Sequence, residues 1–251
     1  MTNDISEPAS QGSRSHRRDA ARKGGGWKLF LRDLLIIFVA AILISFLVKT
    51  YLVRSFYIPS SSMENTLQID DRILVNQLEP RFFPISHGDV VVFTDPGGWL
   101  PSISSEPLNW VVGAVDGVLA FVGLSAPDSS NHLIKRVIGL PGDTVECCNE
   151  FGQIMVNGIP LEEPYIVLPD AVTKATNDDF SVTVPDDSIW VMGDNRYNSA
   201  DSAFHRDDPT GGFVKIDSVV GRAFLISWPT QRWGVLDNYE TTFQRVTQNA
   251  E

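Results

Sequence analysis

Residues 133–143 have the sequence LIKRVIGLPGD, an apolar run that ends in a Gly-Leu-Pro-Gly-Asp turn signal. Leu, Ile and Val at this density are typical of a strand core, and Gly and Pro mark a strand end. Lys135 stands out, because lysine is rarely buried in a strand core. Taken alone, it predicts a lysine on an edge strand whose ammonium group reaches solvent.

Similar runs lie on both sides of this stretch, separated by Gly, Pro, Asp and Asn. Runs rich in Val, Ile and Phe with such boundaries predict short strands. Asn157-Gly158 predicts a two-residue hairpin, since a type I′ turn needs positive φ at both central positions. No segment after residue 53 has sustained amphipathic helical periodicity, so we expect a mainly β fold. The predicted strands are residues 71–75, 89–93, 133–138, 153–156, 181–184, 188–192 and 219–227.

The chain before these strands contains a stretch apolar enough to cross a membrane. Residues 34–48 have the sequence LLIIFVAAILISFLV, with Ser45 as their only polar residue. Extended to Val53, the stretch has about 20 residues, which at about 1.5 Å per residue span a hydrocarbon core of about 30 Å. We therefore predict one transmembrane anchor over residues 27–53. A cleaved secretory signal is the alternative, but the run is long for one and no small-x-small cleavage pair follows it.

The charges beside the anchor predict its orientation. Seven Lys and Arg residues precede the apolar run that begins at Leu34, whereas Lys49 and Arg54 lie near its other end. The positive-inside rule places the N-terminus in the cytoplasm, so we expect a single-pass protein of the cell membrane with residues 54–251 outside. Residues 1–26 are rich in Ser, Arg, Gly and Asp and are typical of a disordered cytoplasmic tail.

The composition of the body excludes one class of partner. Residues 50–251 carry 12 Lys and Arg against 27 Asp and Glu. Nucleic acid is therefore not expected to be the main partner, because phosphate binding needs a basic face. The lipid bilayer is the partner that the anchor implies. Hydrophobic residues make up 43% of the chain, enough to build a core.

Three features remain open from sequence. Residues 94–132 form an apolar insertion that is too short and too rich in glycine for a second span, so it is either a core-packing excursion or a loop on the bilayer surface. Residues 147–184 are expected to form a β-hairpin region. Cys147 and Cys148 have no zinc-ligand spacing, and they are either two small reduced residues or a vicinal disulfide.

Four short segments, each weak by itself, follow the anchor in a fixed order. They are IPSSSM at residues 58–63, GDVVVF at 88–93, KRVIGLPGD at 135–143 and GDNRYNSADS at 193–202. A serine triplet after proline is ordinarily a turn, and a polar stretch such as the last segment is ordinarily a surface loop. Together, however, the four segments resemble the bacterial type I signal peptidases, and they cover about half of residues 54–229. With a single anchor, the chain is most similar to the Gram-positive, actinobacterial-type members.

This resemblance implies a signal-peptidase-like β fold in which residues 54–251 form the catalytic domain. It implies that Ser62 is the nucleophile and Lys135 the general base. The oxyanion hole would consist of the Ser62 backbone N–H and the Ser60 hydroxyl, and Ser199 would orient the lysine. The supporting residues would be Asp194, Asn195, Arg196, Asp201 and Ser202, and the substrate-binding residues would be Phe56, Ile58 and Ile134.

The resemblance also implies an endopeptidase that removes signal peptides from secretory preproteins after Ala-x-Ala-like sites, with no metal or cofactor. Such chemistry has a physical requirement. A serine hydroxyl needs a base, and lysine is a base only as the neutral amine. Since its reference pKa is about 10.4, work near neutral pH needs a drop of roughly 3 units, about 4 kcal/mol. Burial among Ile134, Val137 and Ile138 is expected to supply that shift.

Two residues depart from the family pattern, and three other assignments compete with it. Ala203 stands where the family often has arginine, so Arg206 or His205 would have to replace it, and Tyr197 stands where an acidic or small polar residue is common.

One competing assignment is a self-cleaving repressor, which is soluble, and another is a penicillin-binding enzyme, which needs an S-x-x-K spacing that Ser62 lacks. A bitopic surface protein with a β-rich binding domain is the third, and it gives no reason for Lys135 to accompany Ser62.

Overall fold

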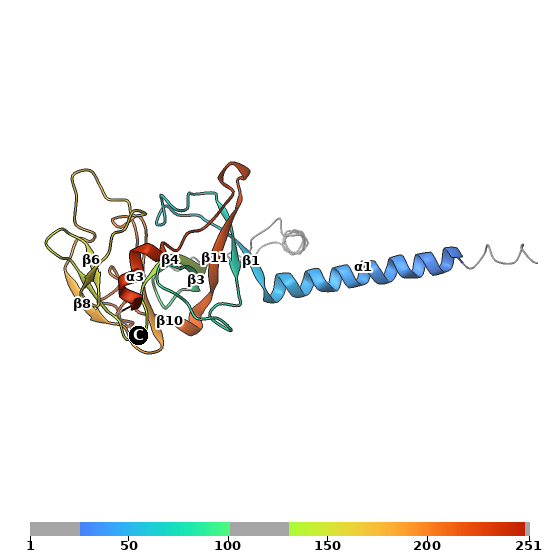
Figure 1. The fold of residues 1–251 in the computed structure, drawn as a ribbon, viewed down its shortest axis with the longest axis horizontal. Coiled ribbons are helices and arrows are strands. Elements are labelled where there is room, and N and C mark those ends of the chain that lie inside the picture. Colours follow the sequence, from blue (N-terminus) through green and yellow to red (C-terminus); the bar gives the residue numbers. More distant parts are fainter. Residues whose placement is uncertain (1–25, 101–130, 249–251) are drawn as a thin grey trace, which may run out of the picture. The chain divides into compact units, whose positions relative to one another are not determined.

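The computed structural model describes residues 26–100 and 131–248, which fall into two units divided after Val48. The first contains most of helix α1 (Gly26–Tyr51), drawn in blue in Figure 1. Its stretch Gly26–Val48 has a mean hydropathy of 2.5 and no buried side chains, so it is long and apolar enough to span a membrane. The predicted anchor ran to residue 53, whereas Val53 begins strand β1 (Val53–Tyr57), where it pairs with Asn76. The predicted tail lies almost wholly outside the described residues.

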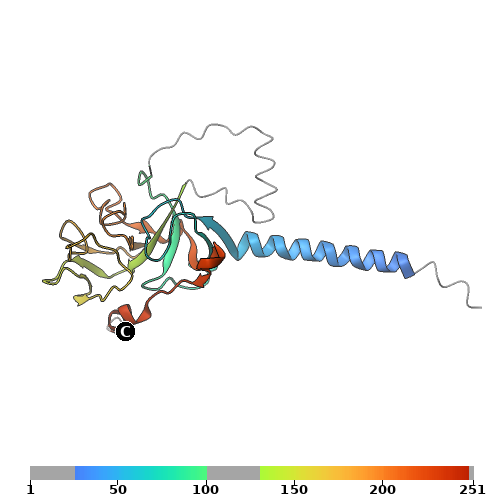
Figure 2. The ribbon, with the colours of Figure 1, turned by 90° about the horizontal axis from the view of Figure 1, so that it is seen from above.

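The second unit is mainly β, as predicted (Figures 1 and 2), and its larger sheet is antiparallel throughout. The strand order is β1-β2-β11-β3-β4-β9-β10, with β12 paired to β11. The bounds are β2 (Arg72–Asn76), β3 (Val90–Thr94), β4 (His132–Gly139), β9 (Ser188–Met192), β10 (Val214–Lys215), β11 (Val219–Trp228) and β12 (Gly234–Val235).

Strand β4 lies inside this sheet, between β3 and β9. Lys135 pairs with Val91 of β3 and is only 3% exposed. An edge position with the amine in solvent, which Lys135 alone predicted, is therefore wrong. The apolar residues around it, including Val137 and Ile138, are buried as the sequence indicated. The physical reason is that β4 is covered on both faces, as a nearly continuous apolar run requires.

A smaller sheet has the order β7-β6-β5-β8, with β5 (Thr144–Cys147), β6 (Ile154–Val156), β7 (Ile159–Pro160) and β8 (Phe180–Thr183). Strands β6 and β7 form the predicted hairpin. Asn157 and Gly158 have φ values of 52° and 75°, which a type I′ turn needs. In the second unit, β6 and β8 lie on the side away from β1 (Figure 1).

Several short elements escaped prediction. They are strands β1, β5, β10 and β12, the 3₁₀ helices η2 (Ile216–Ser218) and η3 (Thr230–Arg232), and helix α3 (Glu240–Gln248). Helix α3 buries only Phe243 and Val246, which pack on the apolar cluster of the small sheet. Two buried positions are too few to give a helical period in the sequence. Most of the predicted apolar insertion, residues 101–130, lies outside the described residues.

Candidate active site

The site centres on Ser62, in the turn after β1, and Lys135, in the middle of β4. Lys135 Nζ lies 2.8 Å from Ser62 Oγ and donates a second hydrogen bond to the Ile134 carbonyl at 3.0 Å. Ser62 is 7% exposed and Lys135 3% exposed. Residues 73 positions apart thus place a hydroxyl and an amine within proton-transfer distance.

The surroundings of Lys135 favour its neutral form. Burial lowers the pKa of its amine from 10.5 to about 8, because the charged form loses its hydration. The carboxylates of Asp201 and Asp194 act in the opposite direction and raise the same pKa. At a pKa of about 8, roughly a tenth of the amine is unprotonated at pH 7 and can accept a proton.

The serine triplet is held by contacts with the loop of residues 193–202. Asn195 N donates to the Ser62 carbonyl at 3.0 Å, and Asn198 Nδ2 donates to Ser61 Oγ at 2.7 Å. Ser60 Oγ lies 3.3 Å from Ser62 Oγ, on an exposed side of the turn. These contacts fix the Ser62 backbone and leave a second hydroxyl next to its oxygen.

Asp201 and Ser202 fasten this loop to strand β9. Gly193 N donates to Asp201 Oδ2 at 2.9 Å, and Val191 N donates to Ser202 Oγ at 2.9 Å. Burial raises the pKa of Asp201, while the Gly193 N–H and the nearby charge of Lys135 lower it. A Cβ at Gly193 would collide with the Ser199 side chain and the Ser62 carbonyl, so this approach requires glycine.

Ser199 lies beside Gly193 with its hydroxyl oxygen fully enclosed. The two hydrogen bonds of the Lys135 amine go to Ser62 and Ile134, not to Ser199. The Ser199 hydroxyl instead favours the charged form of Asp201. The orienting role of Ser199 toward Lys135 therefore stays a prediction.

Asp194 and Arg136 form a fully buried ion pair behind the site. Arg136 Nε and Nη2 donate to the two carboxylate oxygens at 2.9 and 2.8 Å, and both side chains are 0% exposed. Thr66 Oγ1 donates to the same carboxylate and accepts from Arg136 Nη2 at 3.1 Å. The guanidinium also lies 4.2 Å from the ring centroid of Tyr165. Because strand side chains alternate, Arg136 points away from the side that Lys135 occupies.

Arg196 forms a second buried ion pair, with Glu163. Its Nη1 donates to Glu163 Oε2 at 3.0 Å, and its Nε donates to the Gly193 carbonyl at 3.0 Å. Sequence reasoning missed Glu163, Arg136 and Thr66 as supporting residues. The adjacent Lys-Arg pair in an apolar run was a usable signal for Arg136, but nothing in the sequence indicated Glu163.

The residue after Ser202 departs from the family pattern, and the structure shows how the loop end is held. Ala203 N donates to Asp201 Oδ1 at 3.1 Å. Arg206 pairs with Asp178, and the ring of His205 stacks on Trp99 with centroids 4.5 Å apart. Neither side chain takes the place of the expected arginine at the site, since both are paired elsewhere.

A small cleft of about 70 Å³ adjoins Ser60 and Lys135. The three predicted substrate-binding residues, Phe56, Ile58 and Ile134, contribute to its wall. The full lining is Phe56, Tyr57, Ile58, Pro59, Ser60, Val92, Leu100, His132, Leu133, Ile134 and Lys135. An apolar cleft of this size suits small aliphatic side chains. A hydroxyl beside an amine of lowered pKa, next to such a cleft, can perform acyl transfer.

Comparison with known proteins shows which family and which relatives this chain resembles. The family described as "Signal peptidase, peptidase S26" matches residues 31–228. The chain is 40% identical over 225 residues to "Signal peptidase I" of Mycobacterium tuberculosis (strain ATCC 25618 / H37Rv), covering 82% of this chain and 75% of that one. It is 39% identical to "Probable signal peptidase I" of Mycobacterium leprae (81% and 78% covered) and 36% identical to "Probable signal peptidase I-2" of Synechocystis sp. (79% and 73% covered).

The buried pair behind the site gives a test of stability. Asp194→Asn keeps the size of the side chain but leaves the Arg136 guanidinium buried without a counter-charge, so we expect a loss of about 3–5 kcal/mol in the free energy of unfolding. Urea unfolding of the full chain in detergent, followed by tryptophan fluorescence, measures this loss. The matched control is Asp187→Asn, because Asp187 pairs with Lys215 on the surface, where both side chains are more than 60% exposed. Equal stabilities of the two variants would contradict the assignment.

Proposed function

The chain belongs to the signal peptidase family, peptidase S26, and we propose that it cleaves signal peptides from secretory preproteins with Ser62 as nucleophile and Lys135 as general base. It is a peptidase of the hydrolase class that processes signal peptides. The 2.8 Å hydrogen bond between Lys135 Nζ and Ser62 Oγ carries the proposal. It joins a buried amine of lowered pKa to a hydroxyl that is a weak nucleophile without a base.

The proposed reaction has two stages. Ser62 Oγ attacks the scissile carbonyl carbon while neutral Lys135 takes the hydroxyl proton. The resulting oxyanion accepts hydrogen bonds from the Ser62 backbone N–H and the Ser60 hydroxyl, whose oxygen is 3.3 Å from Ser62 Oγ. The C–N bond then breaks, and Lys135 returns its proton to the leaving amine. Water activated by Lys135 hydrolyses the acyl-enzyme and restores Ser62.

The cleft supports the proposed choice of cleavage site. Its walls, formed partly by Phe56, Ile58 and Ile134, leave little room beside Ser60 and Lys135. An extended peptide presents alternate side chains to one wall, so small residues at two alternate positions fit best. The proposed substrate is therefore a preprotein with an Ala-x-Ala-like site before the scissile bond.

Helix α1 supports membrane anchoring, and the charges beside it support the proposed orientation. Its 23-residue apolar stretch has a mean hydropathy of 2.5, and the Lys and Arg residues are concentrated on its N-terminal side. We place the N-terminus in the cytoplasm and residues 54–251 outside, where translocated signal peptides end.

Two substitutions test the proposed pair. Ser62→Ala removes the nucleophile, and Lys135→Met removes the base while keeping an apolar side chain of similar length. Each is expected to lower kcat for an Ala-x-Ala preprotein at least about 1000-fold in detergent or vesicles, because the two groups act as a unit. Matched controls are Ser181→Ala and Lys215→Ala, whose side chains lie outside the site. Near-normal cleavage by either site variant, with an unchanged thermal unfolding midpoint, would reject the pair.

The pH profile tests the role of the Lys135 amine. Because only the neutral form accepts a proton, log kcat/KM should rise with unit slope below the pKa of about 8 and level off above it. At pH 6 the value should be about 100-fold below the plateau. Asp201→Asn removes a charge that raises this pKa, so its profile should shift to lower pH. A profile that is flat from pH 6 to 9, or one that Asp201→Asn shifts upward, would oppose the assignment.

Protease protection tests the orientation. A protease added outside spheroplasts should degrade residues 54–251 and leave an N-terminal tag intact. After detergent treatment, the tag should be degraded as well, which shows that the protease can cleave it. Protection of residues 54–251 before detergent treatment would reverse the proposed topology.

A further inference from the structure

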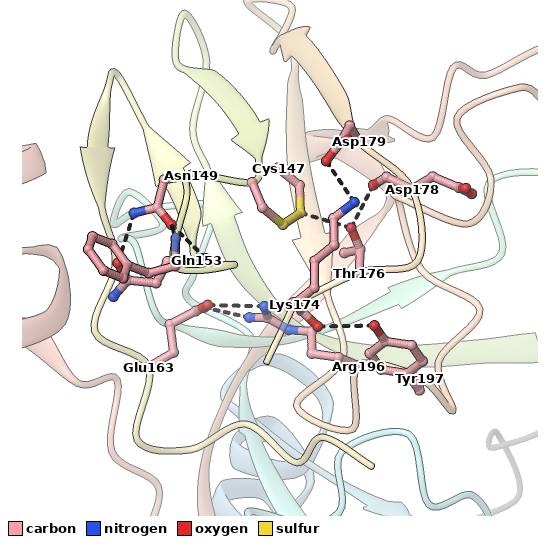
Figure 3. The surroundings of a disulfide bond; sticks show 12 residues. Cys147, Asn149, Gln153, Glu163, Lys174, Thr176, Asp178, Asp179, Arg196 and Tyr197 are labelled. Carbon is pink, nitrogen blue, oxygen red and sulfur yellow. Dashed lines mark hydrogen bonds and ion pairs between the residues drawn. A yellow bond between two sulfur atoms is a disulfide. The ribbon is translucent and has the colours of Figure 1, made fainter. Parts of the chain in front are cut away.

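A vicinal disulfide joins the only two cysteines of the chain, Cys147 at the end of β5 and Cys148 directly after it (Figure 3). Cys147 is 5% exposed and belongs to the apolar cluster of the small sheet, while Cys148 is partly buried against that cluster. Among the described residues, Cys147, Cys148 and Asp179 also form one group with metal-ligand atoms close together. Because the two sulfur atoms are bonded to each other, we consider the pair as a redox centre.

This disulfide adds little to fold stability in the usual way. A disulfide stabilises a protein mainly by limiting the unfolded chain, and the gain grows with the length of the closed loop. Adjacent residues close the shortest loop possible. Its surroundings therefore indicate its role better than a stability argument does.

The disulfide contacts a segment defined here as the 173–179 segment. Thr176 Oγ1 lies 2.9 Å from Cys147 Sγ and 2.7 Å from the Asp178 carbonyl. Asp179 accepts a hydrogen bond from the Cys148 backbone N–H, and its carboxylate pairs with Lys174 Nζ at 2.8 Å. Both cysteines are thus tied to this segment, one through a side chain and the other through its backbone.

The 173–179 segment in turn contacts the loop of the active site. Tyr197 OH donates to the Lys174 carbonyl at 3.1 Å. The neighbouring Arg196 donates to Glu163 (Figure 3) and to the Gly193 carbonyl. Gly193 N is held by Asp201, whose charge influences the Lys135 pKa. A continuous set of contacts therefore runs from the sulfur atoms to the groups that hold Ser62 and Lys135.

We propose that Cys147–Cys148 is a redox-modification site whose reduction loosens the 193–202 loop and lowers turnover, an inference that rests on the proposed function. The reductant is a dithiol. Its two thiols supply two electrons and two protons, the Sγ–Sγ bond breaks to give two thiols, and the dithiol becomes a disulfide.

Packing determines which residues move when the disulfide is reduced. Bonded sulfur atoms are about 2 Å apart, whereas two thiols must separate to a non-bonded distance. Cys147 is enclosed by apolar neighbours such as Val145 and Ile154, which resist displacement in a close-packed core. Movement is therefore directed to Cys148 and the 173–179 segment. A shifted Lys174 carbonyl weakens the bond from Tyr197 and loosens the loop.

The experiment compares the oxidised and dithiol-reduced full chain in detergent. Mass spectrometry monitors the thiols, and because the chain has no other cysteine, every reductant effect is assigned to this pair. Reduction should lower kcat for an Ala-x-Ala substrate by about threefold or more, with KM unchanged, which is within the range of coupling effects between sites. Reoxidation should restore kcat.

Two variants and a second readout make the test specific. The double variant Cys147→Ser/Cys148→Ser should not respond to the dithiol. Tyr197→Phe lacks the link to Lys174, so its kcat should respond less than that of the wild type. Hydrogen exchange should speed up in residues 173–179 and 193–202 on reduction, and this readout needs no cleavage activity.

The outcomes are distinguishable. Free thiols in protein isolated from the extracytoplasmic side, or equal kcat and hydrogen exchange in both redox states, would overturn the redox proposal. If neither state cleaves the substrate but hydrogen exchange still changes on reduction, the proposed function fails and the coupling stands. An equal response of Tyr197→Phe and wild type would reject the path through Lys174.

Discussion

The burial of one amine constrains the rest of this site. Lys135 lies inside an eight-stranded sheet, where a charged ammonium group is unfavourable and the neutral amine is tolerated. Its two hydrogen bonds, to Ser62 Oγ and the Ile134 carbonyl, hold the amine without neutralising a charge. Close apolar neighbours are needed to keep water away, and for that reason the lysine belongs in a central strand.

The next residue on the same strand shows what the environment decides. Arg136 is as buried as Lys135, but it points the other way and meets the Asp194 carboxylate in a bidentate pair. Its pKa is raised by that partner, whereas the pKa of Lys135 is lowered by burial. The pKa values of these two adjacent basic side chains thus shift in opposite directions, because strand alternation gives only Arg136 a direct counter-ion.

The sequence was informative wherever the signal is local. The strand around Lys135, the strand Ser188–Met192 and the turn at Asn157 follow from apolar runs and turn chemistry. The position of β4 inside the sheet did not follow, because strand order depends on long-range pairing. Supporting residues such as Glu163 were missed for the same reason, since its partner Arg196 lies 33 positions away and acidic residues at turns are common.

The 193–202 loop controls both position and proton affinity. It holds the Ser62 carbonyl through Asn195 N, and it sets the charge near Lys135 through Asp201. The Asp201 carboxylate also accepts hydrogen bonds from the backbone N–H groups of Gly193 and Ala203, so it holds the loop at both ends. This arrangement explains how the loop keeps its shape without an arginine after Ser202. A displacement of the loop changes the position of Ser62 and the pKa of the Lys135 amine together. Contacts on the side of the loop that faces away from Ser62 can therefore act on both properties.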